Sequence, residues 1–309
     1  MLNNIFIFIV ALVMVVKGAT MATKYATPLA KRLRLSEYTV GFIIIAIISI
    51  LPETFISISS SLEGVPSFGL AMLLGSNVAD LTLIFAAIIF LTGRDLKVES
   101  KILKNHITYP LLLILPLVLG LNGHFSRAEG IVLMLAGGAF YYMSFKNGTK
   151  RATPLNTEKD ILKNLFMLLF SMTVLLIGSY FTVSSATALA YSLGVTPILV
   201  GMLVVGLGTT MPELFFALKS IKKADDSLAI GDILGTVLAD ATIVVGILAL
   251  VNPFSFPPRI IYTTGVFMVL ASFILFHFMR TKRDISKREG YMLFVFWLCF
   301  VFIEFLLNK

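Results

Sequence analysis

The sequence predicts an all-α, polytopic membrane protein with about ten transmembrane helices in two inverted five-helix repeats. Three observations predict this fold class: an apolar composition, apolar runs long enough to span a bilayer, and an internal repeat. Of 309 residues, 58% are hydrophobic and 14% are charged, whereas an average soluble domain has about 45–50% and 25%. Little polar sequence remains for an aqueous domain, and long unbroken apolar runs favour helices over a barrel.

Apolar runs separated by polar breaks give the expected helices in chain order. The expected spans are 3–26, 37–60, 66–92, 107–122, 128–146, 162–193, 197–219, 226–251, 259–280 and 289–307. The first apolar run has no lysine or arginine before it, and the first basic residue, Lys17, follows it. We therefore expect a retained first helix and not a cleaved signal peptide.

The two halves of the chain repeat at an offset of 160 residues. The matching segments are 40–41 with 200–201, 51–53 with 211–213, and 75–80 with 235–240. Each half then holds five spans, and an odd number inserts the second half upside down relative to the first. We expect, within one membrane domain, a first repeat, a cytoplasmic linker and a second inverted repeat over 1–145, 146–161 and 162–309.

Loop topology explains the formal charge of +8. Most of the 25 lysines and arginines fall in alternate connections between the expected spans. By the positive-inside rule these connections face the cytoplasm, so both termini of this multi-pass cell-membrane protein are expected outside. A nucleic-acid partner is not needed to account for the basic surplus.

Four acidic residues fall inside otherwise apolar spans: Glu53, Asp80, Glu213 and Asp240. The interiors of those spans contain no lysine or arginine, and a charge at membrane depth costs roughly 3 kcal/mol or more. Bound cations or protons would neutralise these carboxylates. Each acid also follows a hydroxyl residue by four positions, which places both on one helix face. These hydroxyl residues are Ser49, Ser76, Thr209 and Thr236.

Proline precedes each glutamate directly, at Pro52 and Pro212. Because proline lacks a backbone donor, we expect free carbonyls about one turn earlier, near Ala46 and Gly206. Carboxylate, hydroxyl and carbonyl oxygens suit hard ions such as calcium and sodium, whereas zinc and copper prefer clustered His or Cys. No cofactor is expected.

Two further acids have no acidic mate in the other half. Asp232, near the cytoplasmic start of the eighth span, matches Met72 and is equally consistent with an access route or a solvated helix end. Glu304 in the last helix is expected to be peripheral.

These residues resemble the cation/calcium antiporters, particularly the prokaryotic sodium/calcium exchangers. The resemblance covers the whole chain and is most specific in segments that look like the family's paired alpha repeats, at 46–53, 75–80, 206–213 and 235–240. It implies that Glu53 and Glu213 are central calcium ligands with Ser49 and Thr209 beside them. It further implies that the surrounding ion positions come from Ser76, Thr236, Thr210, Asp80, Asp240 and the carbonyls of Ala46 and Gly206.

Two departures from the family pattern bear on the coupling ion. The second half keeps a close version of the family's Gly-Thr-Ser-Leu-Pro-Glu run at 208–213, but the first half has Ile50 where a hydroxyl would help hold one sodium ion. Asp80 stands where many sodium/calcium exchangers have Asn. This additional carboxylate would favour proton coupling, or would simply stay neutral among its acidic neighbours.

The sequence thus predicts a secondary active antiporter, not an enzyme, that exchanges Ca²⁺ for Na⁺ by alternating access. The alternative is an antiporter of H⁺ and Ca²⁺, or another divalent cation, that uses the same four-carboxylate site. An intramembrane aspartyl protease built on Asp80 and Asp240 would leave the repeat and both glutamates unexplained. A passive channel is disfavoured by the inverted repeat with broken helices. The expected partners are the transported ions and the lipid bilayer, and no oligomeric state is predicted.

Overall fold

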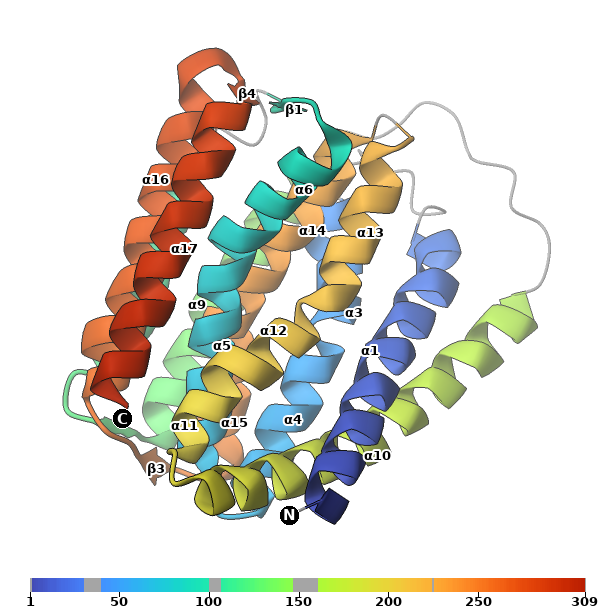
Figure 1. The fold of residues 1–309 in the computed structure, drawn as a ribbon. Coiled ribbons are helices and arrows are strands. Elements are labelled where there is room, and N and C mark those ends of the chain that lie inside the picture. The colour runs from blue at the N-terminus through green and yellow to red at the C-terminus, as the bar shows by residue number, and fades with distance from the viewer. Residues whose placement is uncertain (1, 31–39, 100–106, 147–160, 224, 309) are drawn as a thin grey trace.

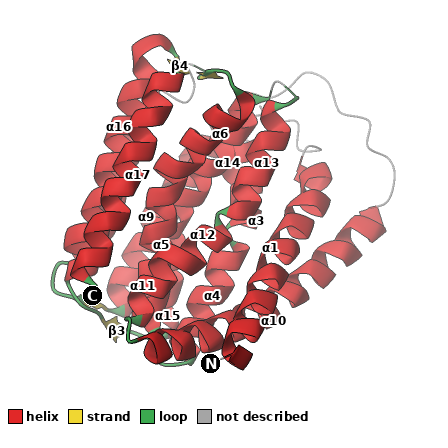
Figure 2. Cartoon of the chain, viewed as in Figure 1, coloured by secondary structure: helices red, strands yellow, loops and turns green. Residues whose placement is uncertain are grey.

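The computed structural model describes residues 2–30, 40–99, 107–146, 161–223 and 225–308. These residues form a helical bundle with two-residue strands at its ends (Figure 1; Figure 2). The predicted linker lies outside the described residues apart from Lys146 and Ile161. The bundle confirms the predicted all-α class.

The first half contains five helical units, two of which are interrupted by π-helical segments. In chain order they are α1 (Leu2–Ala30); η2 (Val40–Ile45), α3 (Ala46–Ser49) and α4 (Leu51–Leu62); α5 (Pro66–Ala79), η3 (Asp80–Ile84) and α6 (Phe85–Thr92); α8 (Thr108–Leu119); and α9 (Arg127–Lys146).

The second half repeats this order. Its units are α10 (Ile161–Leu193); α11 (Pro197–Val200), η4 (Gly201–Val205), α12 (Gly206–Thr209) and α13 (Met211–Ile221); α14 (Asp226–Ala239), η5 (Asp240–Val244) and α15 (Val245–Val251); η6 (Ile260–Gly265) and α16 (Val266–Lys282); and α17 (Lys287–Leu307). Across the described residues, eight helices are long and apolar enough to cross a membrane, and 46–62 and 108–119 are shorter apolar helices. These ten units match the expected spans.

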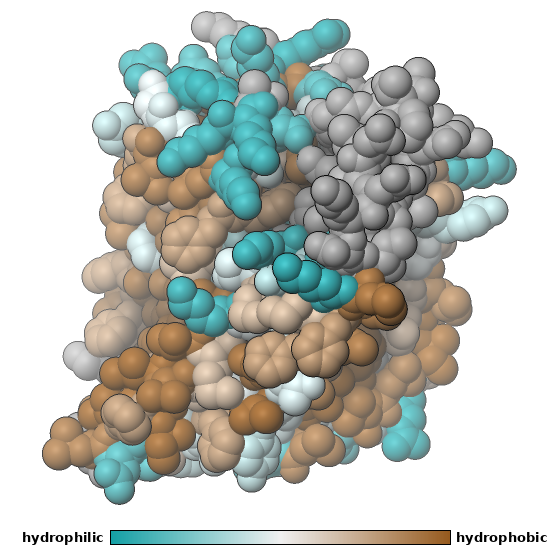
Figure 3. Space-filling model, turned by 90° about the vertical axis from the view of Figure 1, so that its right-hand side faces the viewer, coloured by the Kyte–Doolittle hydropathy of each residue, from teal (hydrophilic) through white to brown (hydrophobic). Residues whose placement is uncertain are grey.

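The two halves run in opposite directions. In Figure 1, α1 rises from the N-terminus while α10 descends, and α5 with α6 rises while α14 with α15 descends. Figure 3 shows hydrophobic side chains over much of one face and hydrophilic ones gathered toward the upper end. Large side chains such as Phe166 and Phe302 are exposed, as expected of helices that face lipid.

Two short antiparallel ladders join the halves, one at each end of the bundle. At one end β1 (Leu96–Lys97) pairs with β4 (Asp284–Ile285), and at the other β2 (His124–Phe125) pairs with β3 (Phe254–Ser255). The offset of 160 residues carries β2 onto β4, and nearly the same offset carries β1 onto β3. The inverted repeat therefore relates the ladder at one end of the bundle to the ladder at the other end.

Helices α5 and α14 occupy the centre: residues 68–79 of α5 and every residue of α14 are buried. Glycine allows the broken helices to approach them closely. A Cβ added at Gly75 would lie 2.8 Å from the carbonyl oxygen of Met202, and one at Gly235 would collide with the carbonyl of Phe42. Because residues 75 and 235, and 42 and 202, are repeat mates, the same close crossing occurs twice. Each crossing sets a π-helical segment, η2 or η4, against a central helix.

Candidate cation-binding site

Both broken helices are interrupted directly before a buried glutamate. The break between α3 and α4 falls at Ile50, and the break between α12 and α13 falls at Thr210. Pro52 and Pro212 fit the first turn of the new helix, where a backbone donor would have no partner. Glu53 and Glu213 lie in those first turns, where the positive end of the helix dipole favours a carboxylate. The predicted broken helices are confirmed.

The two aspartates lie where the central helices change geometry. Asp80 is the first residue of π-helix η3, and Asp240 is the first residue of π-helix η5. Single π-helical turns inside α-helices are frequent at functional sites because they re-aim side chains. In both halves, a threonine lies two positions after the aspartate and donates its hydroxyl to the backbone carbonyl four residues before itself. Thr82 donates to Val78, and Thr242 donates to Leu238.

The four predicted acids are buried and have unpaired oxygens. Each is at most 1% exposed. In the described part of the chain, the site oxygens without a hydrogen-bond partner are Oε2 of Glu53, Oδ1 of Asp80, both carboxylate oxygens of Glu213 and of Asp240, and Oγ1 of Thr236. Unpaired buried carboxylates are strongly unfavourable unless a cation or proton joins them.

These acids come from both halves yet form one electrostatic cluster. Glu213 is repelled by Glu53 and Asp80, and Asp240 is repelled by the same two residues. Within the described residues, the single ion pair joins Arg94 to Asp226, which lies outside the cluster at the end of the bundle. No basic side chain described here neutralises the cluster.

The predicted hydroxyl residues are all buried, but they do not pair with the acid four positions later. Ser76 donates to the carbonyl of Leu73 at 3.0 Å, and Thr210 to that of Leu207 at 3.0 Å. Thr209 lies within hydrogen-bonding reach of Glu53, which belongs to the opposite half. The hydroxyl groups thus approach the carboxylates across the two halves.

The expectation of free carbonyls at Ala46 and Gly206 is wrong in this structure. The Ala46 carbonyl accepts from the backbone N–H of Ile50 at 3.0 Å. The Gly206 carbonyl accepts from Thr210 N–H at 3.2 Å and from Thr209 Oγ1 at 3.0 Å. The reason lies in helix geometry: a proline removes the bond to the carbonyl four residues earlier, which is residue 48 or 208.

Asp232 belongs to the cluster, although the sequence left its role open. It is 0% exposed, so it is no solvated helix end. Ser49 Oγ donates to Asp232 Oδ1 at 3.0 Å, and Oδ2 has no partner among the described residues. Electrostatic repulsion links it to Glu53, Asp80 and Glu213. Its spacing of four residues from Thr236, and eight from Asp240, is the signal that could have revealed it.

The acidic side chains of the cluster do not converge on a single point. Among the residues that the structure describes, no three His, Cys, Asp or Glu side chains are placed to hold one metal ion. Calcium takes six to eight oxygens at short distances. A complete shell would therefore combine two or fewer converging carboxylates with hydroxyl and carbonyl oxygens.

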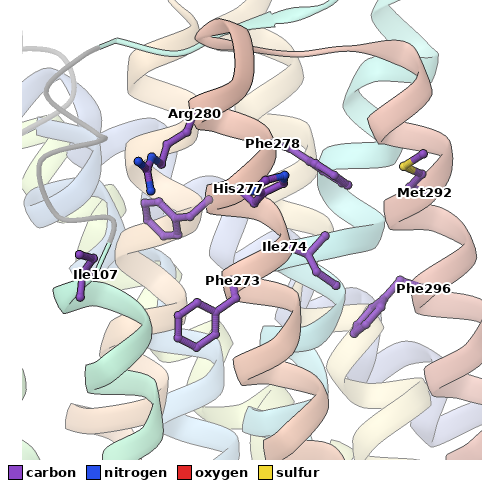
Figure 4. A pocket seen from close by; sticks show the side chains of 9 residues that line it. Ile107, Phe273, Ile274, His277, Phe278, Arg280, Met292 and Phe296 are labelled. Carbon is purple, nitrogen blue, oxygen red and sulfur yellow. The ribbon is translucent and has the colours of Figure 1, made fainter.

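Two other features lie apart from the cluster. Glu304, expected to be peripheral, is buried, but its carboxylate accepts from Thr264 Oγ1 at 2.5 Å and from Asn308 Nδ2 at 3.0 Å. A pocket of about 640 Å³ lies along α16 and α17 (Figure 4). It is lined by aromatic and aliphatic side chains with His277 and Arg280 and contains no acidic residue.

Inverted halves, helices broken at midlength and unpaired buried carboxylates together define a secondary active membrane antiporter. The family model for the sodium/calcium exchanger protein matches residues 3–146 and again 163–306. The chain belongs to this family and is a cation/calcium antiporter. The two matches also reproduce the 160-residue repeat.

Curated relatives and solved structures are similar to the chain over most of its length. The chain is 25% identical to "Sodium/calcium exchanger MaX1" of Methanosarcina acetivorans, with 98% of each chain covered, and 24% identical to "Inner membrane protein YrbG" of Escherichia coli, with 96% of each covered. The solved sodium-calcium exchanger NCX_Mj has a TM-score of 0.72 at 21% identity and 96% coverage of both chains. The H⁺/Ca²⁺ exchanger CAX has a TM-score of 0.81 at 16% identity, covering 96% of this chain and 81% of that chain. Both solved folds are similar to this one.

Proposed function

We propose that the protein exchanges Ca²⁺ for Na⁺ across the cell membrane by alternating access. The observation that carries the proposal is the set of unpaired carboxylate oxygens that both halves contribute to one buried cluster. Calcium binds between Glu53 and Glu213, at the two helix breaks, with the hydroxyl oxygens of Ser49 and Thr209 beside them.

The remaining predicted ligands surround this central position. They are Ser76, Thr210, Thr236, Asp80, Asp240 and the carbonyls of Ala46 and Gly206. The Ala46 carbonyl accepts one hydrogen bond in the structure and keeps a second lone pair. The Gly206 carbonyl accepts two, so it becomes a ligand only when the Thr209 hydroxyl turns toward the ion.

Calcium and the counter-ion compete for the same oxygens, so the carrier moves one ion only in exchange for the other. Without a cation the clustered carboxylates repel one another at a depth where charge is strongly unfavourable, which disfavours crossing of the unloaded carrier. Calcium and the counter-ion each relieve this repulsion, but they cannot occupy the same oxygens together. A loaded site is therefore required in both directions of transport.

A second candidate is H⁺/Ca²⁺ exchange, which the charge balance favours. Five buried acids form the cluster once Asp232 is included, whereas one calcium ion supplies two positive charges. The remaining carboxylates must hold protons or other cations. Ile50 also sits at the break where its mate Thr210 has a hydroxyl, which leaves one oxygen fewer for sodium.

Radioactive calcium uptake into proteoliposomes tests both candidates. An imposed outward sodium gradient is compared with an imposed pH gradient, for the wild type and for Glu213→Gln. Sodium-driven uptake that is lost in the variant supports the first candidate, and pH-driven uptake indifferent to sodium supports the second. Uptake under neither gradient contradicts both.

The orientation of the chain is part of this proposal. Both ends of the described chain lie at the end of the bundle opposite β1 and β4 (Figure 1). The basic connections around Arg94 and Lys287 meet at the β1–β4 end. We place this end in the cytoplasm and the termini outside, with repeats over 1–145 and 162–309. An enzyme reporter fused to the C-terminus, active only outside the cytoplasm, checks this.

A further inference from the structure

Beyond Glu53, helix α4 continues as a face of hydroxyl groups. Ser57 and Ser61 follow Glu53 by four and eight residues, so the three side chains share one face. Ser57 is 1% exposed and Ser61 is 4% exposed, and neither Oγ atom has a hydrogen-bond partner among the described residues. The next residue, Leu62, is 77% exposed. The face therefore runs from the cluster to the end of the bundle, roughly 12 Å at 1.5 Å per residue.

The other half shows that packing does not require these hydroxyls. The repeat mates of Ser57 and Ser61 are Ala217 and Ile221, which are 0% and 3% exposed. Hydrocarbon therefore fits the same positions of the fold. A buried hydroxyl without a hydrogen-bond partner is unfavourable. The presence of two such hydroxyls, on Ser57 and Ser61, in one half alone therefore indicates that a polar species contacts them.

A neighbouring serine provides the contrast. Ser60 donates to the Ser57 carbonyl at 2.8 Å, and its Oγ packs where a Cβ on Gly69 would stand. Its repeat mate, Ser220, is also a serine. The Ser60 hydroxyl thus has a hydrogen-bond partner, whereas the hydroxyls of Ser57 and Ser61 have none among the described residues.

The two ends of the bundle also differ in charge. Arg94 donates to the Ile221 carbonyl at 3.0 Å and to both Asp226 oxygens, at 2.6 and 2.8 Å. The Asp226 carboxylate, by accepting these bonds, raises the pKa of Arg94 above its ordinary value. A guanidinium thus stands where the apolar face of α13 ends. Two lysines, Lys222 and Lys223, follow α13 at this end, whereas Glu63 follows α4 at the other end.

We propose that Ser57 and Ser61 form a hydroxyl file along which a partly dehydrated Na⁺ or Ca²⁺ reaches Glu53 from the end of the bundle where α4 ends. Their oxygens replace lost water ligands, as hard cations require. The corresponding face of α13, with Ala217 and Ile221, offers no such oxygens in the described conformation. The inference rests on the proposed function only in taking the acidic cluster as a cation site.

Thiol accessibility tests the file without measuring transport. In a Cys299→Ser background, which removes the chain's single cysteine, Ser57→Cys and Ser61→Cys are compared with Ala217→Cys and Ile221→Cys in sealed vesicles. The probe is Ag⁺, a thiol-reactive cation close to Na⁺ in size. Thiols left free are counted after denaturation with a maleimide. We expect Ag⁺ to protect the two α4 positions and to spare both α13 controls. Equal reaction at all four positions, or none at α4, overturns the proposal.

A rate measurement separates a path from a packing contact. Ser57→Ala with Ser61→Ala should lower the initial rate of calcium exchange about tenfold and leave equilibrium calcium binding to the purified protein within about twofold. Ser60→Ala is the control and should change neither. An unchanged rate in the double variant overturns the file. Absence of exchange in the wild type would contradict the proposed function, while the Ag⁺ reaction would still decide the file.

Discussion

The side chain of Asn77 donates from Nδ2 to the backbone carbonyl of Val237, its own repeat mate, at 3.3 Å. Two residues 160 positions apart thus meet where α5 and α14 lie together at the centre. Residues related by a twofold axis meet only beside that axis, so this bond marks the pseudo-twofold axis of the inverted repeat. The acidic cluster is built around the same place, because Asp80 and Asp240 lie three residues further along each helix.

Replacement of Asn77 by valine, the residue at its repeat mate 237, tests the contact between α5 and α14 at the axis. Asn77→Val removes the bond to Val237, whose carbonyl keeps its backbone bond from the Asp240 N–H, so we expect about 1 kcal/mol of lost stability. Thermal unfolding of the purified protein in detergent measures the change. Asn77→Ser, which is smaller but still polar, is the matched variant. An Asn77→Val protein as stable as the wild type would show that the bond contributes little.

The two central glutamates should be indispensable for calcium exchange. Glu53→Gln and Glu213→Gln keep the shape of the side chain and remove its charge, and each should lower exchange about a hundredfold or more. Glu304→Gln is the control, because that acid is also buried but already has Thr264 and Asn308 as partners. Calcium uptake into proteoliposomes measures all three. Equal losses in all three variants would indicate a general folding defect.

Calcium binding should weaken as the pH falls. Protons and calcium compete for the same buried oxygens, so acid favours the protonated, calcium-free cluster. Asp232→Asn removes one titrating group and should make the dependence shallower. Isothermal titration of calcium at several pH values measures both slopes. A pH-independent affinity in the wild type would mean that the carboxylates bind calcium without releasing protons.

The Ser49–Asp232 contact should couple two sites in opposite halves. Ser49→Ala and Asp232→Asn each remove one partner of the 3.0 Å bond, and together they should weaken calcium binding less than the sum of the single effects. A double-mutant cycle on the calcium affinity measures this coupling. Strict additivity would show that the bond has no role in holding the cluster.

Ile50 should determine how strongly sodium is used. Ile50→Thr gives the first break the hydroxyl that Thr210 supplies in the second, and should lower the sodium concentration for half-maximal exchange severalfold. Ile50→Val, of similar size but without the hydroxyl, is the control. If protons are the coupling ion, Ile50→Thr leaves the response to sodium unchanged.

The sequence was most informative where its two halves agree. The repeat identified Glu53, Asp80, Glu213 and Asp240 because chance rarely places acids at matching depths of apolar helices. Asp232 escaped this reasoning because its mate, Met72, is apolar. Its burial depends on how α14 packs against α3, and one sequence does not reveal that crossing. The strands were also missed, because two residues such as Leu96 and Lys97 show no alternation.

The carbonyl expectation failed for a local reason. The proline rule identifies which bond is lost but not how neighbouring donors rearrange, and Ile50 and Thr210 kept their backbone bonds across the breaks. The hydroxyl residues were located correctly on the buried faces. Their partners, such as Asp232 for Ser49, lie across the interface between halves and depend on tertiary packing.

The two strand ladders make each half an incomplete module. Strands β1 and β2 of the first half pair with β4 and β3 of the second half. A half produced alone therefore has two strands without a pairing partner. It can pair them only with a copy inserted in the membrane the other way up. Two separately expressed halves should therefore reassemble into one bundle, and a single half should assemble only if it populates both orientations.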